Sequence, residues 1–320
     1  MGVWVIDTDV LADSRFTVSP LTEALACLSL LEYGHAPLGQ QEWLRAHVGA
    51  YRRMMATDPV RRPLVRAALR ARSVADFLAV PPQPGDSLAA ELARVSRTPA
   101  ATALADLRAD GPVDASLDRP DLAERAADLL EWVWTHTVEP DWARRRRLFE
   151  ADIVARAQQL GAVGWKAALD RLRPGLRWLG DGRLQINAYD NPPRTLSGAQ
   201  LLFIPSSARR GWVAWRLPKR YAVVYPCSAR LAEPGGSAPP QALARLLGPG
   251  RAETLCLLDT PLSTTQLVAL TGSGLGSIGR HLRVLLDAQL VRRRRAGRSV
   301  LYYRTDSGEH LVRSNRHPTP

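Results

Sequence analysis

Apolar residues recur at helical spacing through most of the first 172 residues. The clearest start is Ser19-Pro20, where a capping serine precedes a proline at the first helical position and the pattern runs from Leu21 to Leu31. Similar patterns predict further helices, at 41–56, 60–79, 86–95, 99–109, 120–137, 140–160 and 163–172. The first half of the chain is therefore expected to be mainly helical.

The pattern changes to short strands after Arg173-Pro174-Gly175. Four runs rich in β-branched and aromatic residues follow, namely 183–190, 201–206, 211–217 and 221–226. They are expected to pair with the apolar run 3–7 in one small, mostly antiparallel sheet. The predicted fold class is α+β.

A stretch of Pro, Gly and Ser at 233–240 predicts a linker, because such a composition does not build a core. We therefore expect an α+β regulatory or dimerisation domain at 1–232 and a second domain at 241–320. The second domain is expected to begin with two short helices, 240–247 and 251–258.

The second domain then shows a helix, a tight turn and another helix. Ser263 and Gln266 have the spacing of a capping box, and Leu262 and Leu267 that of a hydrophobic staple. After a turn at 271–273, a helix over 275–288 places Ile278, Leu282, Leu285 and Gln289 on one stripe. Two runs, 290–295 and 299–304, predict a hairpin whose turn uses Gly297.

Charge distinguishes the second domain from the first. The whole chain has 43 basic residues, 41 of them arginine, against 31 acidic residues, a net charge of +12. Its last 80 residues carry 12 arginines and five acids. A positive field concentrated on one domain favours a polyanionic partner.

The segment 264–305, TTQLVALTGSGLGSIGRHLRVLLDAQLVRRRRAGRSVLYYRT, resembles the winged helix-turn-helix of ArsR/SmtB-type bacterial transcription regulators. Weaker similarity at 6–31, 196–207 and 222–226 is to the N-terminal region that precedes such a winged helix in actinobacterial members. The resemblance implies a repressor of transcription that binds double-stranded DNA as a homodimer.

In that interpretation the helix 275–286 enters the major groove and the hairpin lies along the adjacent backbone or minor groove. Arg280 is expected to contact guanine, since its guanidinium can bond O6 and N7 together. The predicted DNA-binding residues are Ser273, Leu275, Ser277, Arg280, His281, Arg283, Arg292, Arg294, Arg298 and Tyr302. The run Arg144–Arg147 favours a solvated helix face over a second nucleic-acid patch.

Metal and enzyme chemistry have little support in the sequence. The metal-binding Cys-x-Cys-Asp cluster of many family members is replaced by Ser263–Gln266, so no metal or other cofactor is expected. The segment 274–279 has the GxGxxG spacing of a dinucleotide-binding loop, but it lacks the preceding strand that such a loop requires. Asp7 and Asp13, in a segment that mimics the first strand of PIN-type nucleases, are expected to be turn or cap residues. We expect no enzyme.

The alternative hypothesis is a winged-helix scaffold that binds protein and responds to a small-molecule effector.

The first domain is larger than dimerisation requires, so an effector, either a small molecule or a protein, is expected to bind it. The predicted pocket lies between the 183–226 strands and the 120–172 helices, with an apolar wall of Trp132, Trp178, Trp212, Trp215 and Tyr221. The alternative for the tryptophans is a plain aromatic core, which their density in the sequence favours over a pocket.

The location expected for the protein is the cytoplasm, in association with the nucleoid. The three cysteines form no CxxC pair, which fits a reducing compartment. No run of 18 apolar residues occurs, and the first residues carry acids where a signal peptide needs basic residues, so no membrane association is expected.

Overall fold

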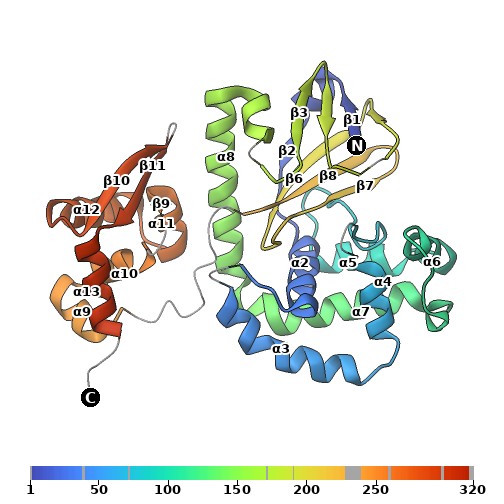
Figure 1. Ribbon diagram of the computed structural model, residues 1–320, viewed down its shortest axis with the longest axis horizontal. Coiled ribbons are helices and arrows are strands. Elements are labelled where there is room, and N and C mark those ends of the chain that lie inside the picture. Colours follow the sequence, from blue (N-terminus) through green and yellow to red (C-terminus); the bar gives the residue numbers. More distant parts are fainter. Residues whose placement is uncertain are drawn as a thin grey trace. The chain divides into compact units, whose positions relative to one another are not determined.

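The computed structural model describes residues 2–37, 40–70, 73–170, 172–189, 191–227, 239–258, 261–296 and 299–316. The chain forms two compact units, and Figure 1 labels their elements. The first unit contains the residues up to Trp142 and Trp165–Cys227. The second contains Ala143–Gly164 and the described residues from 239 onward. Most of the predicted linker 233–240 lies outside the described residues.

Helices form most of the first unit, and their positions agree closely with the sequence prediction. They are α1 (Thr8–Ala12), α2 (Pro20–Tyr33), α3 (Gln41–Ala56), α4 (Arg61–Ala68), α5 (Leu88–Ser96), α6 (Ala100–Arg108) and α7 (Leu122–Val133). The long helix α8 (Trp142–Asp170) is interrupted at Gly164, near the break predicted between 140–160 and 163–172. The Ser19 side chain accepts a hydrogen bond from the Thr22 amide, as its capping role requires.

The helix predicted over 60–79 is too long. It ends at Ala68, and the Phe77 amide donates instead to the Asp106 carboxylate, at 2.7 Å. Short-range sequence pattern does not reveal such a bond, because its acceptor comes from α6. The segment that follows α4 is therefore not helical.

Two four-stranded sheets lie in the first unit, so the prediction of one mostly antiparallel sheet is wrong. The strands are β1 (Val3–Ile6), β2 (Arg15–Phe16), β3 (Arg177–Gly180), β4 (Arg183–Gln185), β5 (Arg194–Leu196), β6 (Gln200–Ser206), β7 (Val213–Arg216) and β8 (Arg220–Pro226). One sheet has the order β3-β4-β1-β5 and the other β2-β6-β8-β7. The pairs β1–β5, β2–β6 and β6–β8 are parallel.

Burial on both faces explains why β6 and β8 pair with each other. Both strands are almost continuously apolar, a composition typical of central parallel strands. The shorter β7 lies outside β8 as an antiparallel edge strand. The prediction of a mostly antiparallel sheet did not include this parallel pair.

The sheet β2-β6-β8-β7 separates two hydrophobic cores. Leu202, Ile204 and Val224 face the helices α2 to α7, which gather on one side of this sheet in Figure 1. The alternate residues Leu201 and Phe203 face the second core, which includes residues of β1, β4 and β5. The first unit therefore consists of a helical layer and two sheet layers.

The second unit has eight described elements besides its part of α8. They are α9 (Gln241–Leu247), α10 (Pro249–Leu257), β9 (Leu262–Ser263), α11 (Thr264–Thr271), α12 (Leu275–Asp287), β10 (Val291–Ala296), β11 (Ser299–Arg304) and α13 (Asp306–Arg316). Strands β10 and β11 form an antiparallel hairpin, and β9 adds a third strand beside β11. The predicted helices, turn and hairpin all occur.

Several local predictions for this unit are confirmed in detail. Ser263 Oγ accepts from the Gln266 amide at 3.2 Å, and the Gln266 side chain accepts from the Ser263 amide at 2.8 Å, which completes the capping box. Gln289 is an exception, since α12 ends at Asp287 and Gln289 is exposed with φ +55°. The turn residue Gly297 lies outside the described residues.

Within the described ranges, no helix has both the length and the apolar character needed to cross a bilayer.

Candidate nucleic-acid interface

The helix α12 is fixed along one side and open along the other. Ile278, Leu282 and Leu285 are at most 2% exposed, and α12 packs against α10, α11 and β10. Burying each such side chain contributes about 1.5–3 kcal/mol relative to exposing it. The outer face carries Arg280 and Arg283, both exposed. The buried stripe therefore holds two guanidinium groups outward on a rigid helix.

The N-terminal end of α12 is formed by a tight turn. Gly272 adopts the left-handed conformation, with φ +70°, that ends α11 and reverses the chain. The amide of the next residue, Ser273, donates to Thr271 Oγ1 at 3.1 Å. Leu275 follows at the first position of α12 and is 63% exposed. An apolar side chain is thus presented to solvent at the leading end of the helix.

His281 supports α12 from within, in contrast to the outward arginines. Its Nε2 is 3.3 Å from Ser277 Oγ, and a Cβ on Gly250 of α10 would lie only 2.7 Å from the same nitrogen. Partial burial lowers the pKa of His281 below its usual 6.5, and the nearby Arg251 and Arg280 lower it further. The surroundings of the ring therefore favour its neutral form, and the ring lies close to Gly250 of α10.

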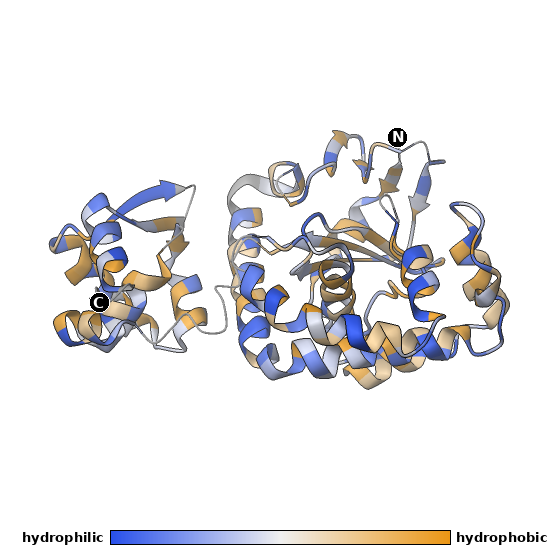
Figure 2. Ribbon diagram, turned by 60° about the horizontal axis from the view of Figure 1, so that its bottom comes forward, coloured by the Kyte–Doolittle hydropathy of each residue, from blue (hydrophilic) through white to orange (hydrophobic). Residues whose placement is uncertain are grey.

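The hairpin offers arginines on both of its faces. Arg292 to Arg295 are all exposed. Side chains alternate between the two faces of β10, and the pairing of Val291 with Arg304 fixes the register of the hairpin. Val291 is buried, so Arg293 shares its face, and Arg292 and Arg294 lie on the other. Figure 2 shows this strand as mainly hydrophilic. Tyr302, opposite Arg293, is half-buried.

The base of the hairpin is held by side chains that sequence analysis did not single out. The Arg304 side chain is only 5% exposed, and its Nε donates to the Leu258 carbonyl at 3.2 Å and pairs with Glu309 at 3.1 Å. The Thr305 amide donates to the Leu290 carbonyl at 3.0 Å. Arg304 therefore has a structural role, in contrast to the exposed arginines of β10.

The predicted DNA-binding residues thus separate into three groups. Leu275, Arg280, Arg283, Arg292 and Arg294 are exposed on α12 and β10. Ser273, Ser277, His281 and Tyr302 are half-buried. Arg298 lies outside the described residues.

Comparisons with protein-family models, with curated proteins and with solved structures find no match. In addition, no group of three or more His, Cys, Asp or Glu side chains among the described residues is placed to hold a metal ion. Any function therefore has to be argued from the residues of this chain.

The five aromatic residues predicted to line an effector pocket do not share one cavity. Trp132 and Trp212 pack against the helical core. Trp178, Trp215 and Tyr221 belong to the core between the sheets. Because the sheet β2-β6-β8-β7 lies between these cores, the expected pocket wall is divided, and its members fill hydrophobic cores.

Trp215 also takes part in a polar cluster that sequence analysis missed. Its side chain forms a hydrogen bond to Asp76, and the Arg194 guanidinium lies 4.4 Å from its ring centroid. Burial, and to a lesser extent the neighbouring Asp106, raises the pKa of Asp76 to about 7, although the hydrogen bond with Trp215 and the charge of Arg194 oppose the rise. The cluster connects the segment after α4 with β5 and β7.

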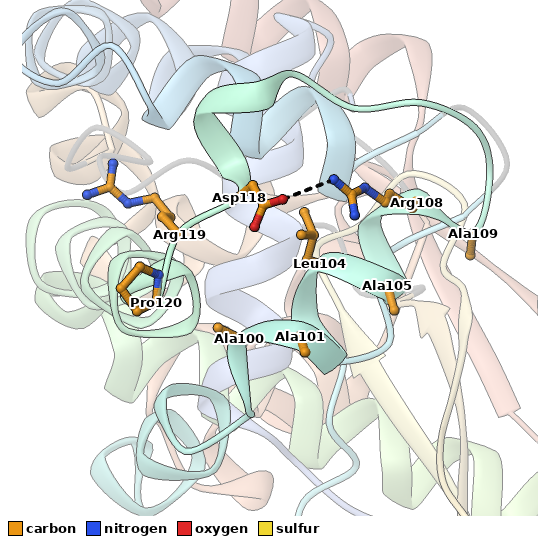
Figure 3. A pocket seen from close by; sticks show the side chains of 9 residues that line it. All are labelled: Ala100, Ala101, Leu104, Ala105, Arg108, Ala109, Asp118, Arg119 and Pro120. Carbon is orange, nitrogen blue, oxygen red and sulfur yellow. Dashed lines mark hydrogen bonds and ion pairs between the residues drawn. The ribbon is translucent and has the colours of Figure 1, made fainter.

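A hollow of about 660 Å³ lies elsewhere in the first unit, beside α6 (Figure 3). Alanines of α6 and Leu104 form its apolar side, and an ion pair of 3.4 Å between Arg108 and Asp118 crosses it. None of the five aromatic residues that the sequence prediction assigned to an effector lines it.

Proposed function

We propose that this protein is a sequence-specific DNA-binding transcriptional regulator of the ArsR type, acting as a repressor. Its second unit is a winged helix-turn-helix in which α11 and α12 are the two helices and β10–β11 is the wing. The partner is double-stranded DNA. The exposed outer face of α12 is the observation that carries the proposal.

That face has the properties a recognition helix needs. Arg280 and Arg283 project from a helix held by three buried side chains, and the acids of α12 are confined to its last residue, Asp287. A protruding helix fits the major groove, and an arginine fork can bond guanine O6 and N7. In this proposal Arg280 reads a base, and the half-buried Ser277 and His281 maintain its position.

The wing supplies contacts that do not depend on sequence. Arg292 and Arg294 lie on one face of β10, and each phosphate contact made by such a residue releases bound counterions. Phosphate contacts orient a protein on the duplex, whereas base contacts specify the site. The proposal therefore assigns affinity mainly to the wing and specificity mainly to α12.

Dimeric binding is part of the proposal. A two-fold dimer places its recognition helices about 34–36 Å apart, or at a multiple of that spacing, to match a palindromic site. Regulation by a soft metal at the start of α11 is not part of the proposal, because Ser263 and Gln266 already use their side chains to cap that helix.

The test is selection of bound duplexes from a random pool, followed by measurement of affinity for a selected and a scrambled duplex. Arg280→Ala should cost about 1–3 kcal/mol on the selected duplex, roughly a 5- to 150-fold loss, and little on the scrambled one. Arg313→Ala on α13 is the matched control, since it removes the same charge from a side chain that is 75% exposed. Equal losses on both duplexes would contradict the role of Arg280, and failure to enrich any sequence would contradict the function.

A further inference from the structure

The second unit contains a basic element that the proposed recognition helix and wing leave unexplained. The α8 segment Ala143–Gly164 belongs to this unit although it is distant in sequence, and it carries five arginines against two acids. Four of the arginines are consecutive, at Arg144–Arg147. On a helix, consecutive residues point in different directions, so each has its own environment.

Three of these arginines differ clearly in what surrounds them. Arg145 is only 1% exposed. Arg146 is exposed and forms an i,i+4 ion pair with Glu150 at 2.8 Å. Arg147 is exposed, and among the described residues it takes part in no ion pair with a carboxylate. Because Glu150 is already paired, Arg147 retains an uncompensated positive charge.

The Arg147 side chain extends to the turn between α11 and α12. Its Nη1 would be 3.6 Å from a Cβ placed on Gly272, the left-handed residue of that turn. The same turn leads into Leu275 and the exposed face of α12. A guanidinium from a distant part of the sequence is thus placed next to the leading end of the helix.

In a helix-turn-helix complex, the backbone of the duplex passes beside the ends of the helix that occupies the major groove. An arginine at this position meets phosphate oxygens before it meets a base edge. Its fork of N–H donors suits a phosphate, and its contribution does not depend on the base sequence.

We propose that Arg147 of α8 is a further DNA contact, which binds a backbone phosphate flanking the groove that α12 enters. The inference rests on the proposed DNA-binding function and adds α8 to the interface. The alternative role for Arg147 is structural, as a side chain that only supports the Gly272 turn.

The test compares Arg147→Ala with Arg146→Ala in the full-length chain. Affinity for the selected and the scrambled duplex is measured over a series of salt concentrations. Arg147→Ala should weaken binding to both duplexes by the same factor and reduce the log–log salt slope by about one. Arg147→Lys should retain most of that slope. Arg146→Ala removes the same charge from the preceding residue and should leave the log–log salt slope unchanged.

An Arg147→Ala slope equal to that of Arg146→Ala would overturn the inference. So would an unchanged slope accompanied by faster hydrogen exchange at 271–275, which would assign Arg147 a structural role. Failure of the underlying function is distinguishable, because the unsubstituted chain would then bind the selected duplex no better than the scrambled one. In that case Arg280→Ala would also have no selective effect.

Discussion

Replacing Gly279 with alanine tests the stability of α12 and its contact with DNA separately. Gly279 lies in the middle of α12, is exposed, and has open space where a Cβ would be added. Glycine within a helix costs about 0.5–1 kcal/mol relative to alanine. Gly279→Ala should therefore stabilise α12 by about that amount, which corresponds to roughly two- to fivefold slower hydrogen exchange of its amides.

The same substitution in α10 should have the opposite effect on α12. In Gly250→Ala the new Cβ would lie 2.7 Å from His281 Nε2, so the ring must shift and its contact with Ser277 Oγ is disturbed. Because the ring is the end of a side chain and can move, the expected cost is at the low end of overpacking, about 1 kcal/mol. Exchange of the α12 amides should become faster in Gly250→Ala and slower in Gly279→Ala.

DNA binding provides the second measurement on these variants. If the outer face of α12 enters the groove, the methyl group of Gly279→Ala lies in the interface, so affinity should fall although the helix is more stable. Unchanged exchange in Gly279→Ala would refute the helical geometry at this position. Slower exchange with full affinity would refute the use of this face for DNA.

Three further predictions concern separate parts of the chain. Burial raises the pKa of Glu91 from 4.5 to about 7, although Leu21 and Ser19 donate hydrogen bonds to its carboxylate. Between these two pH values the folded protein holds a proton that the unfolded chain releases. The free energy of unfolding should therefore fall by up to about 3 kcal/mol as pH rises from 4.5 to 7. Glu91→Gln should make that slope shallower in urea unfolding followed by tryptophan fluorescence, leaving the part due to Asp76, and an unchanged slope would contradict the assignment. Ser263→Ala should destabilise α11 by about 0.5–2 kcal/mol, seen as faster exchange of its first-turn amides, and unaltered exchange would argue against the cap. Arg292→Ala and Arg294→Ala should each lower the salt slope of DNA binding by about one, and slopes equal to that of the unsubstituted chain would remove this face of the wing from the interface.

Local signals in the sequence were sufficient for most of the second unit. The capping box at Ser263, the apolar stripe of α12 and the two strands of the hairpin each depend on residues close together in the chain. The helix α13 was missed, although Thr305 Oγ1 accepts from the Gly308 amide at its start and acids occupy its first turn. A glycine within that turn weakens the helical pattern.

Long-range pairings were the part that the sequence could not predict. The parallel pairing of β6 with β8 joins strands with β7 between them in the chain, and the Phe77 amide, after the end of α4, bonds to Asp106 of α6. The position of Arg147 beside Gly272 joins residues more than a hundred positions apart. The division of the aromatic residues between two cores was hidden for the same reason, because the strand order decides which core each of them enters.

A photo-reactive side chain at Leu275 tests whether the outer face of α12 meets DNA, the contact on which the proposed function depends. Leu275 is 63% exposed and takes no part in the core, so the substitution should leave the fold intact. The same group at Arg313 on α13 is the control. We expect crosslinks from position 275 to bases within the selected duplex and few crosslinks from position 313. Binding of the duplex with no crosslink from position 275, or with equal crosslinks from both positions, would contradict that contact.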